Sequence, residues 1–146
     1  MRERFKLTAP LPLERDIHKA CASALDALLL PPAVWATYPA GAVELSPQQA
    51  ARYSELGLKR GWPDIMVSYG CIWGIELKRR GGRLSQTRIV HTRRGSPRIL
   101  LGQEEVFPQL IESGGFGGIA ICHSVAEMLT ALAAWHVPLR PHRLAA

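Results

Sequence analysis

The sequence has few of the residues that cross-link small secreted or metal-bound domains. Its three cysteines, Cys21, Cys71 and Cys122, are an odd number and show no CxxC spacing. This pattern argues against a disulfide scaffold or a zinc knuckle and favours a reducing compartment. None of the five histidines pair at zinc-ligand spacing, which argues against a histidine zinc site. We therefore expect a cytoplasmic protein.

The sequence also lacks long apolar runs and nucleotide-binding motifs. The charged start, Met1 to Pro10, has no apolar run after it, so we expect no signal peptide. The apolar stretch from Ala27 to Ala36 is interrupted by Pro31-Pro32 and is too short to span a bilayer. The motif G-x-x-x-x-G-K-[ST] is absent, so no nucleotide cofactor is expected. The sequence shows no helix-turn-helix or zinc-finger pattern, so we expect no module that reads a DNA sequence.

The chain does contain enough apolar residues for a core, together with an excess of basic charge. Its 146 residues are most simply one domain, and 47% of them are hydrophobic. The formal net charge is +6, and much of the excess lies between Lys59 and Arg98. Clustered basic charge favours a polyanionic partner such as nucleic acid, and the alternative is a basic surface that only confers solubility.

The hydrophobic periodicity predicts an α/β fold with a mixed central sheet and helices on both sides. Apolar residues at helical spacing predict helices at 14–30, 47–56, 103–113 and 125–135. Strands are expected at 33–38, 65–69, 71–75 and 117–122, the last of them buried and parallel to the core sheet. In the helix at 103–113 we expect Val106, Phe107, Leu110 and Ile111 to be buried. Two β-prone runs around a basic turn predict an inserted β-hairpin at about 87–101.

The most informative stretch places two acids and a lysine on the hairpin formed by 65–69 and 71–75. Side chains alternate along a strand, so Glu76 and Lys78 share a face. The odd-length connection Tyr69-Gly70-Cys71 would place Asp64 opposite Glu76. Two carboxylates at one point repel each other unless a cation lies between them. A hard divalent metal ion is the natural occupant of such a site. Such a site suits phosphodiester hydrolysis, with Lys78 orienting or deprotonating the attacking water.

These residues also resemble a known family. Pro63-Asp64 followed by Glu76-Leu77-Lys78 resembles the signature of the PD-(D/E)xK nuclease superfamily. With Gly61 before that motif, and Gly82-Arg83-Leu84-Ser85 and Gln103 after it, the chain is similar to the VRR-NUC family from about Glu14 to about Leu132. The resemblance implies a restriction-endonuclease-like fold in a bacterial or phage protein. It also implies a homodimeric endonuclease that uses Mg²⁺ or Mn²⁺ and acts on branched DNA, such as Holliday junctions or flaps, in DNA repair.

The resemblance assigns roles to individual residues. Asp64, Glu76 and the Leu77 carbonyl would bind the metal, and Glu14 would join them directly or through water. The alternative for Glu14 is a charge favoured at the start of a helix. Gln103 would line the site, unless it is a surface residue at a helix terminus. Ser85 matches a serine of the family.

The basic residues around the site are candidate DNA contacts, because guanidinium groups match phosphate geometry. The expected contacts are Lys59, Arg60, Arg79, Arg80, Arg83 and Ser85, with Arg93, Arg94 and Arg98 in the inserted hairpin. A solvated turn is the alternative for Arg79 to Ser85, and a dimer arm or a solvated tip is the alternative for the hairpin. We place a flexible basic arm at 1–12, the nuclease domain at 13–136 and an irregular tail at 137–146. Two other functions remain open: a non-catalytic DNA-binding protein on this scaffold, and an RNA nuclease.

Overall fold

The hairpin that carries the acidic residues forms the middle of a four-stranded sheet. The computed structural model describes residues 10–39, 44–91 and 93–143. Strands β1 (Val34–Thr37), β2 (Ile65–Tyr69), β3 (Cys71–Leu77) and β6 (Phe116–Cys122) lie in the order β1-β2-β3-β6. Strand β2 pairs antiparallel with both β1 and β3, and β6 pairs with β3 in parallel. The sheet is therefore mixed, as the sequence predicted.

Gly70 alone connects β2 and β3, and it fixes how the two strands are paired. Tyr69 lies opposite Cys71 at the turn, and Ile65 lies opposite Ile75 at the other end. Gly70 adopts a φ of +71°, a left-handed conformation that glycine reaches without steric cost. The connection has an odd number of residues, which is the condition that sets Asp64 against Glu76.

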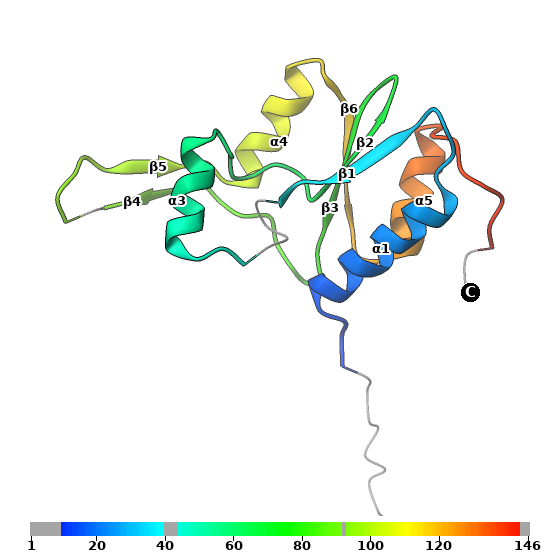
Figure 1. Ribbon diagram of the computed structural model, residues 1–146, viewed down its shortest axis with the longest axis horizontal. Coiled ribbons are helices and arrows are strands. Elements are labelled where there is room, and N and C mark those ends of the chain that lie inside the picture. Colours follow the sequence, from blue (N-terminus) through cyan, green and yellow to red (C-terminus); the bar gives the residue numbers. More distant parts are fainter. Residues whose placement is uncertain (1–9, 40–43, 92, 144–146) are drawn as a thin grey trace, which may run out of the picture.

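Helices cover both faces of this sheet (Figure 1). On one face, helices α1 (Glu14–Leu28) and α5 (Val125–Ala134) pack over the inward side chains of β2 and β3. On the other face, helix α4 (Gln103–Glu112) packs Val106, Phe107 and Leu110 against a smaller apolar cluster. The fold thus has three layers, and the expected α/β class is confirmed.

Two burial predictions are wrong, and both errors come from the end or the edge of an element. Ile111, expected in the buried stripe of α4, is 43% exposed, because it lies beside the stripe in the last turn. Strand β6 was expected to be buried, but it is the edge strand, and Ile121 is 45% exposed.

The space over Gly117 is taken by the indole of Trp73, which stacks on Trp135 with ring centroids 4.8 Å apart.

Two elements stand apart from these layers. Helix α3 (Pro47–Glu55) begins with a capping box between Ser46 and Gln49, but none of its residues is buried. Strands β4 (Arg88–Val90) and β5 (Arg98–Leu100) form a separate two-stranded sheet, which confirms the inserted hairpin. This hairpin projects away from the main sheet (Figure 1).

The C-terminal segment contributes more to the core than expected. Val137 is only 4% exposed and belongs to the main apolar cluster, and Leu139 forms a β-bridge with Leu29. The packed domain therefore continues past residue 136. Residues 1–9 of the basic arm and 144–146 of the tail lie outside the described residues. Within the described ranges, every helix is too short or too polar to cross a lipid bilayer.

Candidate active site

Asp64 and Glu76 come together at the open end of the β2–β3 hairpin. Because Ile65 faces Ile75, the next position along the ladder sets Asp64 against Glu76. Oδ2 of Asp64 accepts a hydrogen bond from the backbone N–H of Leu77 at 2.8 Å. This bond ties the aspartate to the end of β3, and the convergence expected from the sequence is present.

Glu76 is the most unusual charged residue of the fold, because its side chain is only 1% exposed. Its Oε1 lies 2.9 Å from Nζ of Lys78 and accepts a 2.5 Å hydrogen bond from Nε2 of Gln103. Its Oε2 has no partner within the described part of the chain. Burial, together with the charge of Asp64, raises the pKa of Glu76 to about 7, although Lys78 and Gln103 act in the opposite direction.

Lys78 is held as a cation between two carboxylates. Its Nζ lies 2.9 Å from Oε1 of Glu76 and 3.6 Å from Oε1 of Glu14. Burial alone would lower the pKa of Lys78, but the hydrogen bond to Glu76 and the charges of Glu76, Glu14 and Asp64 outweigh it and raise the pKa. A lysine that keeps its proton is suited to orienting groups and stabilising negative charge, rather than to removing a proton.

Gln103 lies inside the site rather than on the surface. It is the first residue of α4 and is 9% exposed. Its Oε1 accepts the N–H of Ser85 at 3.1 Å, and its own N–H donates to Oγ of Ser85 at 3.0 Å. These two hydrogen bonds hold the backbone and the side-chain oxygen of Gln103. The side-chain Nε2 is then placed to donate to Glu76. The hydroxyl of Ser85, expected at a DNA contact, is thus used to position Gln103.

Gly102 allows these two segments to meet. A Cβ atom at this position would collide with the backbone of Ser85, Gln86 and Thr87. We expect Gly102→Ala to lower the free energy of unfolding by about 1–3 kcal/mol, as overpacking does in other cores. Urea denaturation would measure this loss. Gly115→Ala is the matched control, because the nearest atom to its added Cβ lies 3.8 Å away. An unchanged urea midpoint for Gly102→Ala would contradict the packing described here.

The basic residues proposed as DNA contacts are all exposed. Within the described residues, none of their side chains forms an ion pair or a hydrogen bond with another side chain. Arg79 and Arg80 follow Lys78 directly, and the turn closes with a bond from the N–H of Gly82 to the carbonyl of Arg79. The exposed set comprises Lys59, Arg60, Arg79, Arg80, Arg83, Arg93, Arg94 and Arg98.

His123 is a site residue that the sequence did not reveal. Its Nδ1 lies 2.9 Å from the carbonyl oxygen of Lys78, while the N–H of Lys78 donates to the carbonyl of Cys122 at 3.0 Å. The backbone of Lys78 is therefore held on both sides by the end of β6. The contact depends on parallel pairing between strands far apart in sequence, and the only available signal was a histidine directly after the last predicted strand.

The residues present fit a divalent metal bound by two carboxylates. Across residues 10–39, 44–91 and 93–143, no group of three or more His, Cys, Asp and Glu side chains is placed to hold a metal ion. Oε1 of Glu14 lies 3.6 Å from Nζ of Lys78, and its place in the metal's ligand set, directly or through water, stays a prediction. Asp64 and the unpartnered Oε2 of Glu76 are the other candidate ligands. They are sufficient for Mg²⁺, which is usually bound by one or two carboxylates plus substrate phosphates. The Leu77 carbonyl as a ligand stays a prediction.

Comparison with known proteins identifies no relative. No family model matches the chain, and no similar curated protein or solved structure is found. The arrangement of Asp64, Glu76, Lys78 and Gln103 is therefore the main indication of function.

Proposed function

We propose that this protein is a metal-dependent nuclease that hydrolyses phosphodiester bonds in DNA. The observation that carries the proposal is the buried carboxylate of Glu76, whose Oε2 has no partner in the described residues and which lies close enough to Asp64 for their charges to interact. Burying a carboxylate without full hydrogen bonding costs free energy, and that cost is offset if the group binds a cation. Asp64 and Glu76 would hold Mg²⁺ or Mn²⁺. A bound metal would polarise a phosphoryl oxygen and supply an activated water.

The other residues of the site have roles that follow from their contacts. Gln103 and Lys78 both bond Oε1 of Glu76 and leave Oε2 for a ligand. The ammonium of Lys78 would stabilise negative charge on the phosphate and orient the attacking water, and Glu14 keeps that ammonium in place. Arg79 and Arg80 directly follow Lys78, Arg83 comes after the glycine pair, and all three would bind neighbouring phosphates.

The finer parts of the proposal come from the family resemblance. They are a preference for branched DNA such as Holliday junctions or flaps, a homodimer that makes two symmetric cuts, and a place in DNA repair. A non-catalytic DNA-binding protein is the rival function. The site argues against it, because carboxylates directed toward a phosphate backbone weaken binding unless a cation offsets their charge.

One assay panel tests the proposal. The protein is incubated with junction, flap, duplex and single-stranded DNA, and with RNA, in Mg²⁺ or Mn²⁺. Lys78→Ala should lower the cleavage rate by roughly 10²-fold, the scale seen when one charge-stabilising donor is removed from an active site. Glu76→Ala should cut at least as poorly, and Lys19→Ala, an exposed lysine on α1, is the control. Binding without cutting in either metal would favour the rival function, and cutting confined to RNA would change the substrate.

A further inference from the structure

The basic charge of the protein is concentrated in one segment. From Lys78 to Gly102 the sequence has one lysine and seven arginines, and no aspartate or glutamate. Since the whole chain carries a formal charge of +6, the rest of it is slightly acidic. The centre of this segment is the projecting hairpin of β4 and β5, residues 88–100, which we call the basic hairpin. Its position and charge give it a role distinct from the core.

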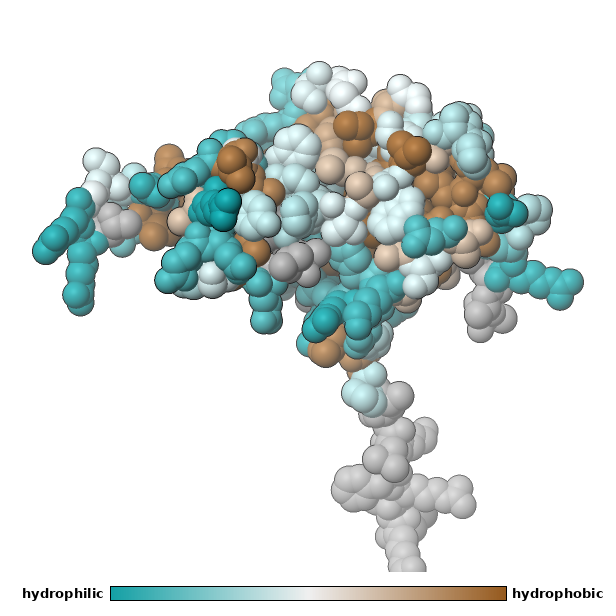
Figure 2. Space-filling model, in the orientation of Figure 1, coloured by the Kyte–Doolittle hydropathy of each residue, from teal (hydrophilic) through white to brown (hydrophobic). Residues whose placement is uncertain are grey.

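The two faces of the basic hairpin differ. Ile89 lies opposite Ile99, and these two side chains are 60% and 67% exposed. Arg88 and Arg98 belong to the neighbouring rungs, opposite Leu100 and Val90, so the other face carries both basic and apolar side chains. Figure 2 shows hydrophobic side chains bordered by hydrophilic ones on this projecting end of the molecule. A single two-stranded hairpin is only marginally stable in water, so an apolar pair exposed on it favours a binding surface.

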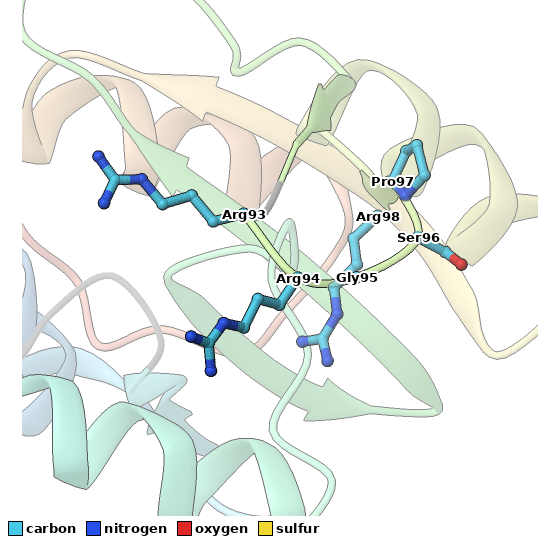
Figure 3. A pocket seen from close by; sticks show the side chains of 6 residues that line it. All are labelled: Arg93, Arg94, Gly95, Ser96, Pro97 and Arg98. Atoms are coloured by element: carbon cyan, nitrogen blue, oxygen red, sulfur yellow. The ribbon is translucent and has the colours of Figure 1, made fainter.

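The tip of the basic hairpin is hollowed and lined by arginine. The hollow is bordered by Arg93, Arg94, Gly95, Ser96, Pro97 and Arg98. In Figure 3 the side chains of Arg94 and Arg98 both extend toward the lower part of the view, whereas Arg93 extends away from them. Within the described residues no acidic side chain forms an ion pair with any of the three. Unpaired guanidinium groups are suited to the phosphates of a nucleic-acid strand.

We propose that the basic hairpin binds duplex DNA beside the cleavage site, with Arg93 and Arg94 at its tip on backbone phosphates and the Ile89–Ile99 face against a groove. This inference deepens the proposed nuclease function and takes its substrate from it. A two-stranded ribbon fits the major groove of B-form DNA, where apolar side chains can contact the methyl group of thymine.

The same observations argue against the other occupants. Proteins that bind single strands stack bases on aromatic rings, and residues 78–102 contain no Phe, Tyr or Trp. A second copy of the chain would bring another strongly basic hairpin to the same place, where like charges repel. A double-stranded polyanion satisfies both the charge and the ribbon shape.

The test measures binding of the full chain to a labelled 24-base-pair duplex and to a 24-nucleotide single strand, in EDTA, by fluorescence anisotropy over a range of salt. We expect Arg93→Ala with Arg94→Ala to weaken duplex binding about tenfold and to reduce the slope of log affinity against log salt by about two. Arg140→Ala with Arg143→Ala removes the same charge outside the basic hairpin and should change neither value. Ile89→Ser with Ile99→Ser should weaken duplex binding and leave single-strand binding unchanged.

Three results would overturn the inference. The first is that the variant with Arg93→Ala and Arg94→Ala binds the duplex with the same affinity and the same salt slope as the wild type. Another is equal loss of duplex and single-strand binding in the isoleucine variant. The third is a dimer in sedimentation that dissociates in the isoleucine variant, which would make this face a subunit contact. Because these measurements need neither metal nor cleavage, a failure of the nuclease proposal would be recognised separately, in the cleavage panel.

Discussion

Replacing Asp64 with alanine is expected to lower the rate of DNA cleavage by about 10³-fold or more, with DNA affinity nearly unchanged. Metal-ion catalysis supplies several kcal/mol of transition-state stabilisation, and each 1.4 kcal/mol corresponds to about a factor of ten in rate. Asp64 is half-buried at the end of the hairpin, and its charge acts on Glu76, the other carboxylate that we propose as a metal ligand. Single-turnover cleavage of a labelled substrate in saturating Mg²⁺ measures the effect.

Asp64→Asn separates catalysis from folding. Asparagine retains an oxygen that can accept the N–H of Leu77, so the end of β3 should stay in place while the negative charge is lost. We expect this variant to unfold at a urea concentration close to that of the wild type and still fail to cut. Glu112→Ala, an exposed acid at the end of α4, is the control. An Asp64→Ala protein that cuts at the wild-type rate would refute the role assigned to this residue.

Glu76→Gln is expected to abolish cleavage and also to change how stability depends on pH. The pKa of Glu76 rises from 4.5 to about 7 in the folded state, mainly through burial. The folded protein therefore holds this proton more tightly than the unfolded chain does. Stability from this group is full below about pH 4.5 and falls as pH rises to about 7. At about 1.4 kcal/mol per pKa unit, the wild type should lose about 3 kcal/mol over that range.

The comparison that checks this prediction uses the free energy of unfolding from urea titrations at pH 5 and pH 8, without divalent metal. The wild type should be less stable at pH 8 by an amount that Glu76→Gln does not show. Titration of groups that do not contact Glu76 is common to both proteins and cancels in the difference. Parallel pH dependence in the two proteins would mean that Glu76 keeps an ordinary pKa, and the case for a cation at Oε2 would lose its main support.

The sequence predicted those parts of the molecule that depend on local pattern. Gly70 between two apolar runs specified the hairpin and, through the odd length of the connection, the opposition of Asp64 and Glu76. Ser46-Pro47 specified the start of α3, which the capping box confirms. The inserted hairpin was predicted from two β-prone runs around a basic turn, and it forms a sheet of its own. These features follow from alternation and turn chemistry within short stretches.

What the sequence missed depends on contacts between distant segments. The bond from His123 to the carbonyl of Lys78 requires β6 to lie parallel to β3, with Leu77 beside Cys122. The exposure of Ile121 depends on β6 being the last strand in the sheet, which periodicity alone does not specify. Gln103 was placed in the site by family resemblance, but its two hydrogen bonds with Ser85 needed the close approach that Gly102 permits.

The pairing of β3 with β6 has a consequence for when the candidate site is completed during synthesis. Asp64, Glu76, Lys78 and Gln103 all precede Phe116, where β6 begins. A nascent chain released at residue 115 would contain all four side chains but would leave β3 as an edge strand. The carbonyl of Cys122 and the ring of His123 would then be missing from the backbone of Lys78. The backbone of Lys78 therefore gains these two contacts only after translation has passed the end of β6.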